Sequence, residues 1–467
     1  MYKLHMNSFH KAALYLWGAI TLSACTISPL KNNQELINQS LPNTSIPRQF
    51  QADKTSAQVF LNVDDVWLRQ FNDPELNDLV AEALQNNPSI QIMAARRTQS
   101  EALINAAGGS QYPGINAIGN TGSKIGSSGT GLTGFYIGAN WEIDLWGRVR
   151  TSIAGAKQNS KAINADQEAA RLSLIATLAK SVWLARSLQE QAQLAKDNMD
   201  AYQKISDLTQ VRERIGASSA NDVASVKITA AQARELAFNA AMARDQALRA
   251  VEVLLGRYPK AEQLKTTSLP ALPQPVAPGL PADLLERRPD LIAAEARVNS
   301  AFYLADEKRL ARLPKISLTA GYGYINSQIF ALINGASTSF GVGANVALPL
   351  FQGGTIEAQI AYQNAEAQAA LANYGKVVLA AFNDVENALN GETTWRERST
   401  QLLIQLDQQK LVMKSTESEF QIGRIDQRQI QQQRIKTNTT DINWRQGQVD
   451  ALAQRVNLYL ALGGSAN

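Results

Sequence analysis

Residues 135–146 read FYIGANWEIDLW, and residues 340–351 read FGVGANVALPLF. In both stretches every second residue, counted from Phe135 and from Phe340, is apolar, and most of the residues between them are small or polar. Alternation with a period of two predicts a β-strand with one apolar and one polar face. Such a strand either packs its apolar face on a soluble core or turns that face toward lipid in a membrane barrel.

The length of these strands favours the membrane interpretation. Each covers about ten residues, which is enough for a tilted strand to cross a bilayer. Weaker alternation over 115–121 and 316–324 predicts a partner for each, giving β-hairpins at 113–146 and 315–351. The polar face would then line an aqueous lumen with Asn140, Glu142, Asp144 and Asn345. An interfacial girdle of aromatic side chains would suit Tyr136, Trp141 and Trp146.

Four strands in one chain cannot close a barrel, and an open sheet edge is not viable in lipid. Closure therefore requires several copies of the chain. Two copies would give eight strands, whose interior is filled by side chains, and three would give twelve, which leaves room for water. The predicted fold class is a membrane β-barrel of twelve strands, closed by a trimer and continued by a long α-helical coiled-coil barrel.

The two strand motifs belong to an internal two-fold duplication. Asn87-Pro88 matches Arg288-Pro289 at an offset of about 201, and Ile215-Gly216 matches Ile422-Gly423 at an offset of about 207. The period is too long for a solenoid unit, so it indicates two domain-sized repeats, at 64–256 and 283–463. The Pro-rich stretch 257–282 between them is predicted to be a semi-rigid linker.

Each repeat also contains a helical hairpin, predicted at 148–256 and 355–462. Residues 148–213 contain no proline and a single glycine, Gly155, so one helix of roughly 100 Å can form. Apolar and small residues recur there every three or four positions, which is typical of a coiled-coil seam. The connectivity places the strand loops outside the cell and the helix turns near Gly216 and Gly423 inside the periplasm.

The N-terminus reads as a processing signal over residues 1–24. Lys3 and Lys11 precede a short apolar run, which ends in Leu22-Ser23-Ala24-Cys25. Small residues ahead of a cysteine resemble a bacterial lipobox, so Cys25 is the predicted lipidation site, carrying acyl chains such as palmitate. The alternative is an ordinary signal with an incidental cysteine. Residues 25–63 are predicted to be an irregular tether along the body of the protein.

Removal of the signal would also remove both histidines, His5 and His10, and lipidation would occupy the only cysteine. The mature chain would then lack the usual ligands of zinc and haem and the residues of Cys–His or Ser–His catalysis. We therefore expect no enzyme activity, no metal and no cofactor. The 45 basic and 41 acidic residues are nearly balanced, which argues against nucleic acid as a partner.

Two patterns that could suggest other chemistry have simpler explanations. The stretch 129–134 fits the dinucleotide fingerprint GxGxxG, but it does not follow a strand and open a helix, so an extracellular loop is favoured. Glu142 and Asp144 could form an acid–base pair, but a lumen lining explains them better.

Several motifs together resemble the TolC-like outer membrane factor family, in its NodT-type lipoprotein branch. They are the lipobox, Trp67–Phe71 with Asp73-Pro74-Glu75-Leu76, Trp141–Arg148, Leu285–Asp290 with Ala294-Glu295, and Leu350–Gly354. The resemblance implies a homotrimer with a twelve-stranded barrel and a twelve-helix periplasmic tunnel. It also implies docking to a periplasmic adaptor and to an inner-membrane pump of the RND or ABC type.

Family members close the inner end of the tunnel with carboxylates and salt bridges near the second helix turn. The position that corresponds to the gate aspartate is Gln432. We hypothesise that Arg424, Asp426 and Arg428 restrain the closed end, with Arg212, Glu213 or Asp222 of the other hairpin as partners. A solvated turn is the alternative.

The predicted function is that of a passive outer-membrane exit duct in a tripartite efflux system for small molecules. The chain would be anchored by lipid in the outer membrane, with its helical body in the periplasm. One alternative is the same duct in a type I protein secretion system. Another is a lipid-anchored periplasmic coiled-coil scaffold without a pore.

Overall fold

The computed structural model describes residues 31–44, 46–47, 49–52, 67–120, 133–275, 281, 284–326 and 337–464. They fall into two compact units. Unit 1 comprises Met1–Thr44, Ala95–Ala165 and Ile292–Val377, and unit 2 comprises Ser45–Ala94, Asp166–Leu291 and Val378–Asn467. Each unit takes chain from both halves of the sequence, so neither unit coincides with one predicted repeat.

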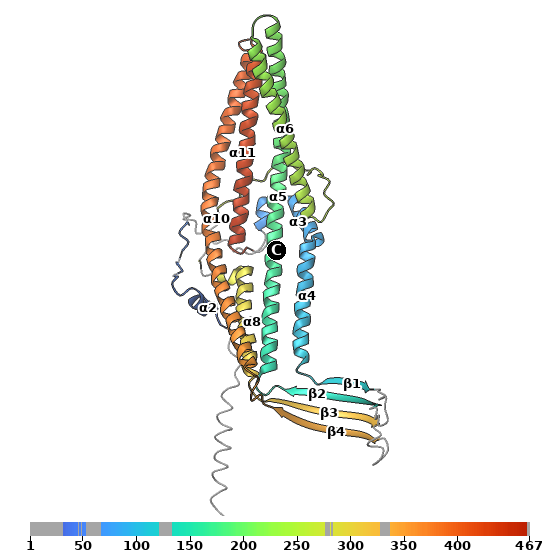
Figure 1. Cartoon of the computed structure of the whole chain (residues 1–467). Coiled ribbons are helices and arrows are strands. Elements are labelled where there is room, and N and C mark those ends of the chain that lie inside the picture. The colour runs from blue at the N-terminus through green and yellow to red at the C-terminus, as the bar shows by residue number, and fades with distance from the viewer. Residues whose placement is uncertain are drawn as a thin grey trace, which may run out of the picture. The chain divides into compact units, whose positions relative to one another are not determined.

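Unit 1 contains an antiparallel sheet of four strands. Along the chain these are β1 (Gly114–Asn120), β2 (Thr133–Ile143), β3 (Lys315–Asn326) and β4 (Ser337–Ala347), and they lie side by side in this order (Figure 1). The predicted hairpins are therefore present, and β2 pairs with β3 to join them. Strands β1 and β4 remain as the two open edges of the sheet.

The register confirms that the apolar positions of the strands share one face. Trp141 of β2 is opposite Leu318 of β3, and Ile137 is opposite Tyr322. Tyr322 in turn is opposite Phe340 of β4. Since paired residues point to the same side of a sheet, the alternation seen in each strand adds up across all four.

The second strand of each hairpin, β2 or β4, ends earlier than predicted. β2 ends at Ile143 and β4 ends at Ala347, although the hairpins were expected to reach residues 146 and 351. In the first case Asp144 accepts hydrogen bonds from the first turn of the following helix, at Val149 and Arg150. In the second case Pro349 has no N–H to donate to a neighbouring strand.

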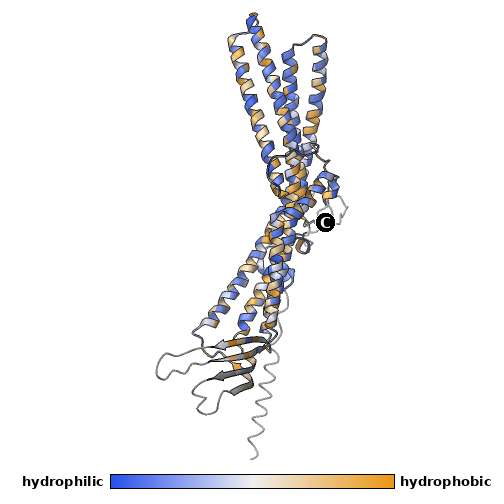
Figure 2. Ribbon diagram, turned by 90° about the vertical axis from the view of Figure 1, so that its right-hand side faces the viewer, coloured by the Kyte–Doolittle hydropathy of each residue, from blue (hydrophilic) through white to orange (hydrophobic). Residues whose placement is uncertain are grey.

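Four helices are much longer than the others. They are α5 (Arg148–Arg214), α6 (Ala220–Leu254), α10 (Thr355–Gln421) and α11 (Gln427–Ala461). Helices α5 and α10 each have 67 residues, and α6 and α11 each have 35. Hydrophilic and hydrophobic residues are interspersed along their whole length (Figure 2). Within the described ranges, none of the helices has the length and hydropathy to cross a membrane.

The turns between the long helices are built alike. Gly216 and Gly423 have φ angles of 76° and 73°, a left-handed conformation that glycine adopts without steric cost. Each return helix then begins with a capping box, formed by Ser219 with Asp222 before α6 and by Asp426 with Gln429 before α11. The predicted turn positions are therefore confirmed.

The segment predicted to be an irregular tether contains a helix, α2 (Asn33–Ser40), which corrects that prediction. Leu36 and Ile37 of α2 are buried. Gly375 of α10 lies under its C-terminal end, where a Cβ atom would come within 3.0 Å of the Ser40 Cβ. The missing side chain at Gly375 therefore lets α2 pack closely on α10.

The remaining helices are shorter. The 3₁₀ helix η1 (Trp67–Phe71) precedes α3 (Pro74–Asn86) and α4 (Pro88–Gly109), and α7 (Leu284–Arg287) precedes α8 (Pro289–Leu310). Three of them start at a proline, which fits the first helical position because its N–H would have no helical partner there. The helix predicted from Pro88 is confirmed and extends to Gly109.

Candidate functional site

The apolar face of the sheet is exposed in the single chain. Relative exposure reaches 71% at Ile115, 56% at Tyr322 and 73% at Val342, on three different strands. Large side chains of this kind are exposed together only where another apolar phase or a partner covers them. The face therefore needs an environment that one chain does not supply.

The opposite face of the sheet is mostly polar or small, with Ile118 and Tyr136 as its large exposed side chains. Ser317 of β3 is opposite both Glu142 of β2 and Asn345 of β4, so these three residues form one row. In the next row Asn140 is opposite Thr319. The structure thus brings together three of the four residues that were predicted to line a lumen, Asn140, Glu142 and Asn345.

Glu142 is paired with basic side chains on this face. Its oxygens lie 2.9 Å from the guanidinium of Arg148 and 2.9 Å from the ammonium of Lys315. Arg148 also pairs with Glu307 of α8 at 2.9 Å. This cluster, which we call the elbow cluster (Glu142, Arg148, Glu307 and Lys315), ties the end of β2 to α5, α8 and β3.

Asp144 was also predicted to lie on the polar face, and this is corrected by the structure. It follows the end of β2, and its carboxylate accepts hydrogen bonds from the backbone N–H groups of Val149 and Arg150 at 3.0 and 2.9 Å. A carboxylate at the start of a helix satisfies free N–H groups and interacts favourably with the helix dipole. Asp144 therefore anchors the start of α5.

At the second helix turn, Asp426 is engaged within its own turn. Its carboxylate accepts hydrogen bonds from the N–H groups of Arg428 and Gln429 at 2.9 and 3.2 Å, and the Arg428 guanidinium lies at 2.7 Å. Burial alone would raise the pKa of Asp426, but the bonds from Arg428 and Gln429 lower the pKa below its ordinary value. The carboxylate is therefore held in its charged form.

At the first helix turn, Asp222 plays the same local role. It accepts hydrogen bonds from the N–H and hydroxyl of Ser219 and from the hydroxyl of Ser218, which lower its pKa. Arg212 donates to the carbonyl of Ala217, also in its own turn. Among the described residues, no ion pair joins the two turns, so the structure does not bring together the predicted cross-hairpin partners.

The glutamine side chains that follow the second turn alternate between exposed and buried positions. Gln432 and Arg424 are exposed, whereas Gln431 and Gln433 are 2% and 9% exposed. The Oε1 atom of Gln431 and the Nε2 atom of Gln433 have no hydrogen-bond partner within the described part of the chain. An unpaired buried amide destabilises the packing around it by about 1–3 kcal/mol.

The Pro-rich linker is held firmly in unit 2, which sequence reasoning did not anticipate. Its backbone N–H groups at Ala261 and Glu262 donate to Glu252, and those at Lys265 and Thr266 donate to Glu75. Further along, Arg396 and Arg455 donate to the carbonyls of Pro273 and Gln274 at 2.6 Å. Side chains from α3, α6, α10 and α11 therefore fix the described part of the linker, residues 257–275.

Two buried arginines anchor this region. Arg186 of α5 is paired with Asp73 at 2.6 Å and with Glu75 at 2.9 Å. Arg455 of α11, which is completely buried, pairs with Glu392 of α10. The motif Asp73-Pro74-Glu75 was conspicuous in the sequence, but nothing in its spacing indicated a partner more than a hundred residues away.

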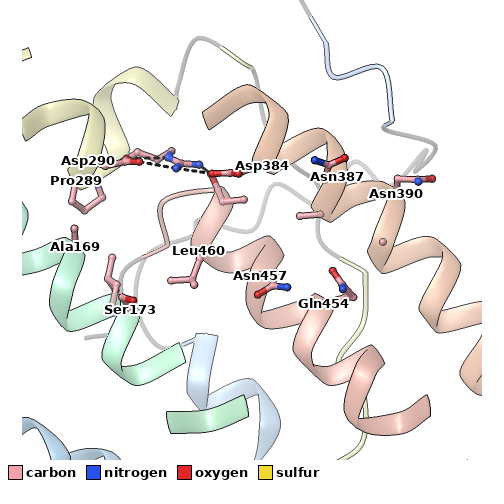
Figure 3. A pocket seen from close by; sticks show the side chains of 15 residues that line it. Ala169, Ser173, Pro289, Asp290, Asp384, Asn387, Asn390, Gln454, Asn457 and Leu460 are labelled. Atoms are coloured by element: carbon pink, nitrogen blue, oxygen red, sulfur yellow. Dashed lines mark hydrogen bonds and ion pairs between the residues drawn. The ribbon is translucent and has the colours of Figure 1, made fainter. Parts of the chain in front are cut away.

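A polar groove of about 660 Å³ lies between α5, α8, α10 and α11 in unit 2. Figure 3 shows amide side chains at its wall, among them Asn387, Asn457 and Gln454. At one end Arg288 pairs with Asp290 at 2.7 Å and with Asp384 at 3.1 Å. Arg288 also donates to the carbonyl of Ala461, so the arginine closes the C-terminal end of α11.

Two sequence predictions concern lipidation and metal binding. Cys25 and the signal at residues 1–24 lie outside the described residues. In the ranges that are described, no group of three or more histidine, cysteine, aspartate or glutamate side chains could hold a metal ion.

Comparison with known proteins identifies this arrangement. The family model described as outer membrane efflux protein matches residues 79–257 and residues 280–464. Outer membrane protein OprJ of Pseudomonas aeruginosa is 26% identical over 460 residues, covering 96% of this chain and 94% of the relative. The toluene efflux pump outer membrane protein TtgC of Pseudomonas putida is 27% identical over 426 residues, covering 85% and 84%.

A solved structure shows the same fold. The outer membrane channel MtrE of Neisseria gonorrhoeae, in its open state, matches with a TM-score of 0.76 and 26% identity. The match covers 94% of this chain and 98% of that channel. The sheet of four strands and the two long helical hairpins are therefore those of an outer-membrane channel protomer.

Proposed function

The chain belongs to the outer membrane efflux protein family and is an outer-membrane efflux channel, and on this basis we propose its assembly and cargo. Three copies form one passive duct for small molecules. The observation that carries this proposal is the two-faced sheet with open edges at β1 and β4. In lipid both edges must be paired, and pairing β4 of one copy with β1 of the next closes a ring. Three copies give twelve strands and a water-filled interior.

In this duct the apolar face of the sheet contacts lipid and the polar face lines the lumen. The exposure of Ile115, Tyr322 and Val342 supports the lipid side. The row of Glu142, Ser317 and Asn345 supports the lumen side, because Glu142 is neutralised by Arg148 and Lys315. A lumen wall of neutral character would leave conduction open to cargo of different charge.

Small molecules are the favoured cargo. The relative from Pseudomonas putida is named for toluene efflux, and toluene is a small apolar molecule. This favours efflux over the type I protein secretion alternative. The partners are a periplasmic adaptor and an inner-membrane pump, which we assign to the RND type; an adaptor would dock at the exposed turns around Gly216 and Gly423.

Three further features complete the proposal. Cys25 carries the lipid anchor, and a tether at residues 25–63 follows it, which the helix α2 docked on α10 supports. The chain is a duplication with repeats at 64–256 and 283–463, supported by the equal lengths of α5 and α10 and of α6 and α11. The second turn, with Arg424, Asp426 and Arg428, restrains the closed inner end.

Two substitutions on one strand test which face meets lipid. Val342 and Asn345 both lie on β4, on opposite faces, and neither side chain is in a packed core. Val342→Lys should lower the yield of membrane-inserted trimers, because a lysine facing lipid costs about 2–4 kcal/mol near the bilayer centre. Asn345→Lys should insert normally and change the ion selectivity of the channel in planar bilayers.

The reverse outcome, with Asn345→Lys failing to insert and Val342→Lys changing selectivity, would place the faces the other way round. Wild-type protein that migrates as a monomer without heating and shows no conductance would support the pore-less scaffold instead of the duct.

A further inference from the structure

Tyr136 lies on the polar face of the sheet, not on the apolar face where an interfacial girdle would require it. It is opposite Gly323 of β3, in the same set of positions as Asn140 and Glu142. Its side chain is 41% exposed. A tyrosine on this face has no lipid interface to occupy, so its position needs another explanation.

The ring of Tyr136 lies flat against the sheet over three glycines. A Cβ atom at Gly138 would be 2.5 Å from the ring atom Cε1 and 3.2 Å from the hydroxyl oxygen. A Cβ atom at Gly323 would be 2.9 Å from Cδ2, and one at Gly321 would overlap the ring and its hydroxyl. Real Cβ atoms do not approach ring atoms this closely, so the flat position exists only because these three residues are glycines.

The neighbouring glycine on β4 shows that this requirement is specific. Gly341 is directly opposite Gly321 and therefore lies at the same level of the sheet, on the same face. A Cβ atom at Gly341 would meet no atom within 4 Å in the single chain. A side chain is thus sterically free at Gly341 and excluded at Gly321, although the two residues are paired in adjacent strands.

We propose that Tyr136 is a permeation-determining residue, whose ring is held against the lumen wall by Gly138, Gly321 and Gly323 so that the lumen stays wide at this level. This rests on the proposed function, in which the polar face lines the lumen of a trimer. A side chain at Gly321 removes the space for the ring, which must then turn away from the wall and into the lumen, in three copies at one level.

The test compares single-channel conductance of purified trimers in planar lipid bilayers. Gly321→Ala should lower the conductance, and Gly341→Ala should leave it at the wild-type value, although both variants replace a strand glycine by the same residue. Tyr136→Ala combined with Gly321→Ala should restore at least the wild-type conductance, because no ring remains to enter the lumen. Equal conductance of Gly321→Ala and Gly341→Ala would overturn the proposal.

A second measurement covers the case in which Gly321→Ala does not form trimers. Tyr136→Cys places a thiol at this level, and a water-soluble thiol reagent added to the open channel should block it in three steps, one for each copy. Asn345→Cys serves as the reference for the lumen face. If the reagent blocks the Asn345→Cys channel and has no effect on the Tyr136→Cys channel, only the role of Tyr136 is refuted. If it blocks neither channel, the assignment of the polar face to the lumen is refuted as well.

Discussion

Arg186 donates hydrogen bonds to both carboxylate oxygens of Asp73, although the two residues are 113 positions apart in the sequence. The guanidinium nitrogens lie 2.6 and 3.0 Å from the two oxygens, and the side chains are only 1% and 6% exposed. The indole of Trp183 donates to the same carboxylate at 3.2 Å. The segment that leads into α3 is thereby fixed to the middle of α5.

Replacing Arg186 should destabilise the protein strongly. In Arg186→Met the Asp73 carboxylate would remain buried without its cationic partner, which typically costs about 3–5 kcal/mol. The expected result is a clear decrease in the thermal unfolding midpoint of the detergent-solubilised protein, followed by circular dichroism. Arg97→Met is the matched control, because the pair of Arg97 with Glu101 is about half exposed and should contribute below about 1 kcal/mol. Equal midpoints for the two variants would contradict the assignment.

The pair of Arg186 and Asp73 also makes the stability of the protein depend on pH. Burial alone would raise the pKa of Asp73, but the hydrogen bonds and charge of Arg186 lower the pKa below the usual value of 3.8. A carboxyl with a lower pKa in the folded state stabilises the fold above its unfolded pKa, and this contribution is lost as the pH falls toward the folded pKa. The unfolding midpoint should therefore decrease from about pH 5 downward. Asp73→Asn should reduce that decrease, and parallel pH profiles for wild type and variant would exclude Asp73 as its source.

Much of the fold was predictable because its signals are local. The alternation from Phe135 onward depends only on the pleat of a strand, and the turns at Gly216 and Gly423 depend on the positive φ angle that glycine allows. The long helices follow from the absence of proline in residues 148–213. These features need no knowledge of which segments meet in space.

The ion pairs that join distant segments, such as Lys315 with Glu142 and Arg186 with Asp73, were not predictable from local pattern. Glu142 looked like a lumen residue from its position in the strand, and only the structure shows Arg148 and Lys315 beside it. The same holds for Tyr136, whose even position was visible in the sequence, while the space over Gly321 comes from the pairing of β2 with β3. The alternation in the sequence thus predicted the two faces of the sheet. The contacts of the charged and aromatic residues on these faces depend on the tertiary structure.

The elbow cluster should control assembly of the sheet more than stability of the helices. Arg148→Ala removes the guanidinium that joins Glu142 to Glu307, so that each carboxylate keeps only a separate lysine, Lys315 and Lys308 respectively. We expect a loss of heat-resistant trimers on gels, with the helix content unchanged by circular dichroism. Arg150→Ala is the control, because Arg150 pairs with Asp144 from a side chain that is 51% exposed. If both variants give wild-type trimer yields, the cluster does not orient the sheet.

The role of the second turn can be separated into a capping part and a charge part. Asparagine caps a helix about as well as aspartate, so Asp426→Asn should keep the start of α11 intact. It removes the negative charge that faces the Arg428 guanidinium at 2.7 Å. If that charge restrains the closed inner end, as proposed, the resting conductance of Asp426→Asn trimers should exceed that of the wild type.

Asp222→Asn provides the matched comparison, because it neutralises the carboxylate of the first turn, whose partners are Ser218 and Ser219 and not an arginine. Its conductance should stay at the wild-type value. A rise confined to Asp426→Asn would assign the restraint to the second turn, where a positive charge faces the carboxylate. Unchanged conductance in both variants would reduce Asp426 to a helix cap. The closure would then have to come from elsewhere, and the buried amides of Gln431 and Gln433, which lack partners in the single chain, would be the next residues to replace.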